Sequence, residues 1–220
     1  MSSSYSVSRK NKVRQLREYA DYDQDTVHRI LDSALVAQVA FMQEGLPVVV
    51  PMIHARDGDT IYLHGARKAR VIRMLEQTAE ACLNVTLLDD IVLARSAFNS
   101  SMNYRSVTVF GEPALIDEEQ DKLHAMRVIS EHLMPGRWDE LRAPHDREVK
   151  MTGVIALDIS SASAKVTEGM PIDEDEDYEI PIWAGVLPLT SVLGELQTDD
   201  RMLQGVEASA AVKALQNRRI

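Results

Sequence analysis

Short apolar segments separated by turn residues run through the chain as far as Thr167, and they constrain its fold more than any other feature. The segments with strand-like composition are Leu35–Met42, Leu46–Ala55, Thr60–His64, Ala81–Leu88, Ile91–Ala97, Tyr104–Ile116, Thr152–Ser160 and Ala164–Thr167. Asp57-Gly58 marks a hairpin, because this pair tolerates the positive φ that tight hairpin turns require. Few helical segments intervene, so we expect a mainly β, antiparallel fold with flanking helices, closed into a barrel that hides its edge strands.

Three segments have the pattern of helices. A short helix capped by Asp25 contains Val27, Ile30 and Leu31, and a second helix covers residues 68–77. A third begins at Asp117, ends near Met134 and carries an apolar stripe, which consists of Leu123, Met126, Ile129 and Leu133. Pro51 lies inside a predicted strand and donates no backbone hydrogen bond, so we expect an edge position or a bulge there.

The 220 residues suit one sizeable domain. We expect an N-terminal arm over residues 1–24, the barrel domain over 25–190 and a C-terminal tail over 191–220 that forms an amphipathic helix. The net charge of −10 argues against a nucleic-acid binder, which needs a broad basic surface. The single cysteine, Cys82, excludes an intrachain disulfide. Neither a secretory signal nor a membrane-spanning run is evident in the sequence. We therefore expect a cytoplasmic location.

The segment Ile61–Leu75 is the strongest indication of a site. A strand ending at His64-Gly65 is followed by three cations, Arg67, Lys68 and Arg70, and then by a helical pattern. The start of a helix attracts anions, because free N–H groups and the positive end of the helix dipole point toward it. In an acidic chain this cluster indicates a bound phosphate, and the alternative is a solvated basic turn.

Three segments in a fixed order resemble one known family. They are GLPVVVPM with DGDTIYLHGARKAR, then YRSVTVFG over Tyr104–Gly111, and finally PIWAGVLPL over Pro181–Leu189. Together they resemble the pyridoxamine 5′-phosphate oxidase-like, FMN-binding split-barrel superfamily, and within it the flavin-nucleotide-binding branch that includes the Nim nitroimidazole-resistance proteins. The resemblance implies an antiparallel split β-barrel of Greek-key type and a homodimer whose two flavin sites lie at the subunit interface.

The resemblance also implies roles for particular residues. Arg67 and Lys68, with Arg70 beside them, would bind the phosphate of FMN, while the backbone of Val50, Pro51 and Met52 would lie along the isoalloxazine ring. The other implied cofactor-binding residues are His64, Gly65, Tyr104, Arg105, Ser106 and Trp183, whose ring offers an aromatic face. His64 matches the histidine near the flavin or substrate in the Nim-like branch and is the candidate catalytic residue; the alternative is a histidine that satisfies a local carbonyl.

The function implied is that of an FMN-dependent oxidoreductase that reduces a small planar acceptor, such as a nitroaromatic or a quinone. True pyridoxamine phosphate oxidases carry arginine and histidine after the late tryptophan, whereas Ala184–Leu189 contains neither, so vitamin B6 oxidation is not expected. Two alternatives remain open: a non-enzymatic flavin-nucleotide binder, and a haem- or deazaflavin-binding member of the same superfamily. No metal ion is expected, because no Cys/His spacing fits a structural zinc site.

Overall fold

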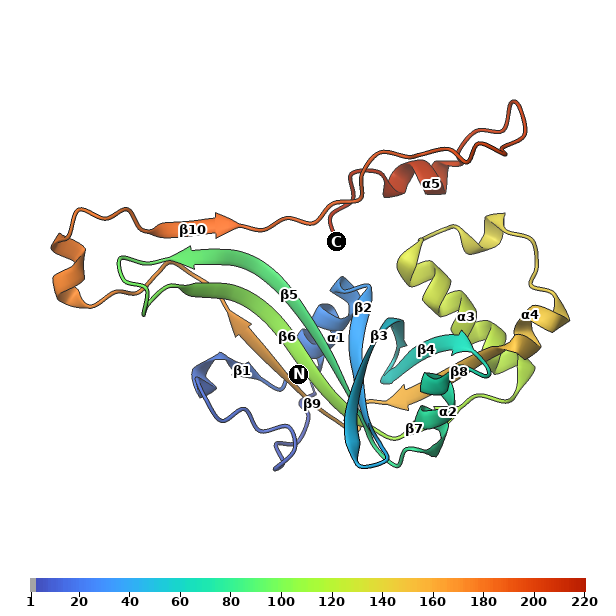
Figure 1. Ribbon diagram of the computed structural model, residues 1–220, viewed down its shortest axis with the longest axis horizontal. Coiled ribbons are helices and arrows are strands. Elements are labelled where there is room, and N and C mark those ends of the chain that lie inside the picture. The colour runs from blue at the N-terminus through green and yellow to red at the C-terminus, as the bar shows by residue number, and fades with distance from the viewer. Residues whose placement is uncertain (1–2) are drawn as a thin grey trace.

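The structure, a computed structural model that describes residues 3–220, is built on one large antiparallel sheet (Figure 1). Its strands are β1 (Ala20–Asp21), β2 (Val36–Gln43), β3 (Leu46–Asp57), β4 (Thr60–Ala66), β5 (Ala81–Leu93), β6 (Ser101–Gly111), β7 (Pro113–Leu115), β8 (Thr152–Asp158), β9 (Ser161–Thr167) and β10 (Gly185–Pro188). The helices are α1 (Gln24–Ser33), α2 (Arg70–Gln77), α3 (Glu119–Leu133), α4 (Asp146–Met151) and α5 (Ala210–Leu215), with 3-10 turns η1 (Arg17–Tyr19), η2 (Trp138–Glu140) and η3 (Asp175–Glu179).

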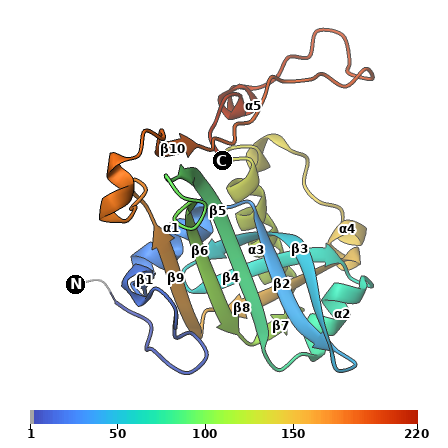
Figure 2. The same ribbon diagram turned by 60° about the vertical axis from the view of Figure 1, so that its left-hand side comes forward.

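The sheet curls around a core but does not close. Its strands follow the order β1-β9-β6-β5-β2-β3-β4-β8-β7. Strand β10 lies off this path and pairs with residues 90–93 of β5. The predicted mainly β, antiparallel split-barrel fold with flanking helices is confirmed, whereas the expected closure of the barrel is wrong. Figure 2 shows the strands curving past one another with β1 and β7 at the two ends of the path.

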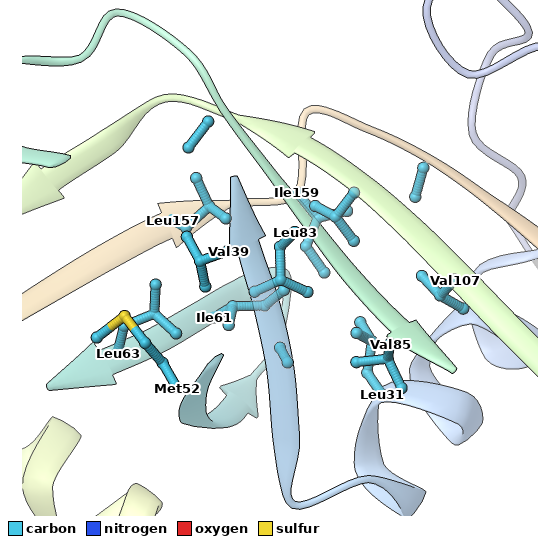
Figure 3. Packing of buried hydrophobic residues seen from close by; sticks show 14 of the residues in the cluster. Leu31, Val39, Met52, Ile61, Leu63, Leu83, Val85, Val107, Leu157 and Ile159 are labelled. Atoms are coloured by element: carbon cyan, nitrogen blue, oxygen red, sulfur yellow. The ribbon is translucent and has the colours of Figure 1, made fainter. Parts of the chain in front are cut away.

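Alternating residues of the strands fill the core. Inward-facing Val39, Leu83 and Val107 are fully buried, as the period of two in a strand requires. Two helices add to the same cluster, because α1 contributes Leu31 and α2 contributes Ile72 and Leu75. Figure 3 shows Leu31 of α1 beside Val85 and near Val107, while Met52 lies beside Leu63. Within residues 3–220, no helix combines the length and the apolar character needed to cross a membrane.

The N-terminal arm is attached to the barrel. The Tyr5 ring is buried, and its hydroxyl lies 3.2 Å from both Asp59 and the Nε2 atom of His28. Asn11 is also buried, and its side-chain amide donates to the carbonyl of Ala162 at 2.9 Å. The Tyr5 contacts tie the arm to α1 and to the turn between β3 and β4, and the Asn11 contact ties it to β9.

Several element boundaries differ from the prediction. The two strands expected on either side of Asp89-Asp90 form one strand, β5, with a register shift between Leu88 and Asp90. The cap of α1 is Asp23, whose carboxylate accepts from the amide of Thr26, and not Asp25. In α3 the buried residues are Lys122, Ala125 and Ile129, so only Ile129 of the expected stripe is fully buried. The expected tail helix is limited to α5.

Candidate functional site

The loop between β4 and α2 begins the candidate site. The backbone N–H of Arg67 donates to the carbonyl of Met151 at 2.8 Å, which ties the loop to the end of α4. Ala69 is the N-cap of α2, and its methyl side chain cannot accept the hydrogen bonds that Ser or Asp would. The first turn of α2 therefore lacks a side-chain acceptor of its own at the place where an anion is favoured.

The three cations of this loop differ in their surroundings. Both guanidinium nitrogens of Arg67 donate to the carboxylate of Glu76, each at 3.1 Å, so α2 holds this side chain in place. Lys68 is exposed and forms no ion pair within the described residues, and Arg70 is exposed at the first position of α2. An incoming phosphate would meet a free ammonium and a pre-positioned guanidinium, which offer a point charge and a bidentate donor respectively.

A glycine on β8 brings α2 close to the sheet. Gly153 pairs with Gly65 of β4, and a Cβ atom at position 153 would lie 2.6 Å from Cγ2 of Ile72 and 3.2 Å from Cα of Arg67. Only a residue without a side chain fits there, so Gly153 sets the distance between the basic loop and the sheet.

His64 lies on β4, three residues before Arg67 of the basic loop. It pairs with Val154 of β8, its side chain is exposed, and no described residue forms a hydrogen bond with its ring. Although the side chain keeps contact with solvent, the protein atoms packed around the rest of it disfavour the charged form and lower the pKa of His64, which favours a neutral imidazole with one nitrogen lone pair at pH 7. The alternative role expected for His64 is a contact with a local backbone carbonyl. Two other histidines have such contacts: His54 with the carbonyl of Leu31, and His132 with that of Ala34.

Val50, Pro51 and Met52 lie on β3 where only one side of the strand is paired. Pro51 faces Gln38 of β2, and the β3–β4 ladder begins only at His54. Of the two expectations for Pro51, an edge position or a bulge, the edge position holds locally, although β3 lies between β2 and β4 in the sheet. Pro51 is exposed, Val50 is half-buried, and the side chain of Met52 points into the core.

Tyr104, Arg105 and Ser106 lie on β6, next to β5. Arg105 donates two hydrogen bonds to the carboxylate of Asp89, at 2.9 and 2.7 Å, which raises the pKa of its guanidinium. Trp183 precedes β10 and is 70% exposed, and its ring lies so close to Gly185 that a Cβ there would be 2.8 Å away. These four residues are half-buried or exposed, and a ligand could reach them.

Within one chain, the predicted site residues lie in two separate groups. The first group, on β3, β4 and the start of α2, contains Val50, Pro51, Met52, His64, Gly65, Arg67, Lys68 and Arg70; the second contains Tyr104, Arg105, Ser106 and Trp183. Strands β2 and β5 lie between β3 and β6 in the sheet, and α2 and β10 lie at opposite ends of the molecule (Figure 1). One chain alone does not bring the two groups together.

Sequence reasoning missed a polar cavity of about 740 Å³ beside the second group. Its lining combines Arg105 and Asp89 with Asp32 at the end of α1 and with Arg218 and Arg219 near the C-terminus. The sequence pattern predicts a break between two strands at Asp89, and nothing in that pattern links Asp89 to the last residues of the chain. Among the described residues, no group of three or more His, Cys, Asp or Glu side chains could hold a metal ion.

Comparison with known proteins gives a consistent family. The family model described as pyridoxamine 5′-phosphate oxidase matches residues 23–166. The flavocytochrome Anf3 from Azotobacter vinelandii is 39% identical, with 95% of this chain and 97% of that chain covered and a TM-score of 0.90. The FAD and heme binding protein from Mycobacterium smegmatis is 34% identical, with 90% and 98% covered and a TM-score of 0.87.

A more distant structure supports the same assignment. A protein described as a 5-nitroimidazole antibiotic resistance protein, from Bacteroides thetaiotaomicron, is 25% identical, with 67% and 86% covered and a TM-score of 0.58. No curated protein matches the chain. The antiparallel fold, the order of the three motifs and these matches agree, and the chain belongs to the pyridoxamine 5′-phosphate oxidase family of flavin-binding split-barrel proteins.

Proposed function

We propose that this protein binds a flavin nucleotide and acts as a flavin-dependent oxidoreductase on a small planar acceptor, such as a nitroaromatic or a quinone. The observation that carries the proposal is the start of α2, where Arg67, Lys68 and an uncapped helix terminus meet directly after β4. FMN fits this arrangement through its single phosphate. FAD contains the same ribityl phosphate, and the protein at 34% identity is described as FAD binding.

The residues of the chain have separate tasks in this proposal. Lys68 and Arg67 hold the phosphate, and the one-sided stretch of β3 at Pro51 offers backbone groups to the edge of a flat ring. Bound flavin supplies hydride transfer, so the protein mainly positions the ring and excludes competing reactions. A neutral His64 can donate or accept a hydrogen bond beside the ring or the acceptor.

We further propose a homodimer in which each flavin contacts both chains. The first group of site residues in one chain would face the second group, with Arg105 and Trp183, in the other chain. This arrangement accounts for the separation of the two groups within one chain, which spans strands β2 and β5.

The visible spectrum of the purified protein tests flavin binding, and steady-state turnover with NAD(P)H and a nitroaromatic or quinone acceptor tests the activity. We expect two flavin bands that bleach on addition of NAD(P)H and recover with the acceptor. A colourless protein whose spectrum does not change when FMN is added would contradict the proposal. Bound flavin without turnover would instead favour a non-enzymatic flavin-nucleotide binder.

His64→Ala tests the role of the histidine in this reaction. Since the side chain is exposed, we expect the free energy of unfolding to change by less than about 1 kcal/mol, while turnover falls or acceptor specificity changes. The matched control is His145→Ala, on the exposed loop before α4, which should leave turnover unchanged. A His64→Ala protein with full activity and wild-type specificity would remove His64 from the site.

Haem binding is the second candidate function, because the flavocytochrome at 39% identity and the FAD and heme binding protein at 34% identity are both named for haem or cytochrome. An axial ligand must offer a free imidazole nitrogen, and His64 fits, since its pKa is lowered and its ring has no partner among the described residues. A Soret band that His64→Ala shifts or abolishes would support this function. A flavin spectrum without a Soret band after expression with added haem would exclude it.

A further inference from the structure

The last 52 residues of the chain form an arm that carries much of its exposed apolar surface. We define the arm as residues 169–220, which leave the end of β9, pair briefly with β5 through β10 and then run along the top of the molecule in Figure 1. The arm is about a quarter of the chain, yet it contains 14 of the 26 large hydrophobic residues that are exposed in the described part. Apolar side chains concentrated in this way indicate an interaction surface.

The arm is attached to its own chain mainly by polar contacts. Near its root, the guanidinium of Arg95 donates to the buried carboxylate of Asp173 at 3.0 Å and lies 4.7 Å from the ring centre of Tyr178. Near its end, the hydroxyl of Ser209 donates to Glu140 at 2.6 Å. These contacts hold the arm in position while apolar side chains between them stay in solvent.

The exposed side chains are large and numerous. Ile172 is 78% exposed, Leu203 is 77% exposed, and Trp183 is 70% exposed. The other exposed large hydrophobic residues of the arm are Met170, Tyr178, Ile180, Ile182, Leu187, Leu189, Val192, Leu196, Met202, Val206 and Ile220. A partner that covered these side chains would remove apolar surface from water, which is favourable.

The outer face of the sheet is also partly apolar and uncovered. Val36 and Met42 of β2, Val49 of β3 and Leu88 of β5 are between 46% and 60% exposed. The ladders pair Val36 with Ile53 and Val49 with Ala40, so these apolar residues share one face of the sheet. The exposure of these four residues shows that this part of the face is open, while α1 and α2 direct their buried residues into the core on the opposite side.

The total surface shows how much a partner could cover. The chain exposes 14134 Å², whereas a folded monomer of 24.6 kDa exposes about 10,100 Å² by the usual scaling of area with mass. The excess of about 4,000 Å² per chain is enough for an obligate dimer interface, which buries roughly 2,000–5,000 Å² in total.

We propose that the apolar side chains of the arm dock on a second copy of this chain, next to its open sheet face. The partner is a second copy because one molecule supplies both the excess area and a second apolar face of matching character. This inference rests on the dimer of the proposed function and adds the segment that forms the interface.

Photo-crosslinking of the full-length protein tests the docking directly. The probe p-benzoylphenylalanine replaces Leu203 or Ile172 in the arm, and Val7, which is 55% exposed in the N-terminal segment, is the control position. We expect both arm probes, but not the control, to give a covalent species of about twice the 24.6 kDa chain mass on denaturing gels. Arm probes that crosslink only within one chain would overturn the inference.

Leu203→Asp and Ile172→Asp give an independent test by sedimentation. Each should raise the dimer dissociation constant at least tenfold, since a charge would be buried in an apolar contact, and Val7→Asp should not. Arm variants that dimerise like the wild type would overturn the docking. Flavin content is measured on the same samples. Crosslinked dimers without flavin would support docking of the arm and contradict flavin binding. Flavin-loaded protein without arm crosslinks would contradict docking of the arm alone.

Discussion

Arg67 and Lys68 are neighbours in sequence, but the structure gives them different surroundings. The carboxylate of Glu76 holds Arg67 from α2, whereas Lys68 extends into solvent. Arg67 is therefore a bidentate donor held in position, and Glu76 partly neutralises its charge. Lys68 supplies a positive charge that no neighbouring carboxylate of the described residues compensates. Both contribute to the same predicted contact, that with the phosphate of a flavin nucleotide.

The Arg67→Ala/Lys68→Ala variant tests this contact at the residue scale. Losing a charge-assisted hydrogen bond to phosphate costs about 1.5–3 kcal/mol, so FMN affinity should fall roughly ten- to a hundred-fold, as measured by flavin fluorescence quenching. Riboflavin, which lacks the phosphate, should bind the wild type weakly and the variant equally weakly. In the matched control Glu76→Gln the carboxylate that competes for Arg67 is gone, so FMN affinity should stay the same or rise. Equal affinity of the wild type for riboflavin and FMN would contradict the assignment.

His54 predicts how stability depends on pH. It is fully buried, its Nε2 lies 3.1 Å from the carbonyl of Leu31, and its ring centre lies 5.6 Å from that of His132. Burial, with a contribution from His132, lowers the pKa of His54 to about 4. Because the unfolded chain binds this proton more readily, near the ordinary pKa of 6.5, stability is lost as pH falls below about 6.5, and the loss is complete below about 4.

Denaturant unfolding at two pH values measures this effect. Between pH 7.5 and 4.5, His54 should account for about 2.5 kcal/mol of lost free energy of unfolding. His54→Gln keeps a side-chain donor near Leu31 but does not titrate, so its stability should fall less over the same range by about that amount. The same pH dependence in the wild type and in His54→Gln would show that other groups cause the loss.

At the scale of elements, the packing of α2 against the sheet positions the basic loop. Gly153→Ala would place a methyl group 2.6 Å from Cγ2 of Ile72 and should destabilise the protein by about 1–3 kcal/mol while weakening FMN binding, because the loop must shift. Gly194→Ala is the matched control, since a Cβ atom there meets nothing within 4 Å, and it should change the free energy of unfolding by less than about 0.5 kcal/mol. Unfolding and FMN titration of both variants check the prediction, and Gly153→Ala with wild-type stability would show that α2 can move freely.

The elements also show which parts of the fold can be predicted from sequence. Hairpins such as β3–β4 depend on local turn chemistry and alternation, and they were predicted with only small boundary errors. Asp89-Asp90 was wrongly predicted as a turn, because β6 stabilises the pair from elsewhere: Arg105 binds Asp89, and the amide of Asn103 donates to Asp90 at 2.9 Å. The open barrel likewise depends on which distant strands pair, and alternation alone does not determine this.

The candidate site shows the same difference between local patterns, which the sequence reveals, and contacts between distant segments, which it does not. The basic loop from His64 to Arg70 is contiguous in sequence, so its place at a strand–helix junction could be predicted. The cavity beside Arg105 could not, since it combines the end of α1, the middle of β5 and the last residues of the chain. Residues that meet only through tertiary structure leave no local pattern.

At the scale of the whole molecule, three observations point to two chains acting together. The site residues fall into two groups on opposite sides of β2 and β5, the outer sheet face carries exposed Val49 and Met42, and the surface exceeds that of a typical monomer of this mass by about 4,000 Å². A dimer would cover the apolar surface and bring the two groups together in one step.

Native mass spectrometry of the protein purified with added FMN tests whether the protein is a dimer with a flavin nucleotide at each of two sites. We expect a species of about twice the 24.6 kDa chain mass that carries two flavin nucleotides, and we expect Arg67→Ala/Lys68→Ala to carry less flavin but to stay dimeric. Single chains without flavin, at micromolar protein and with FMN in excess, would contradict both the dimer and the flavin sites.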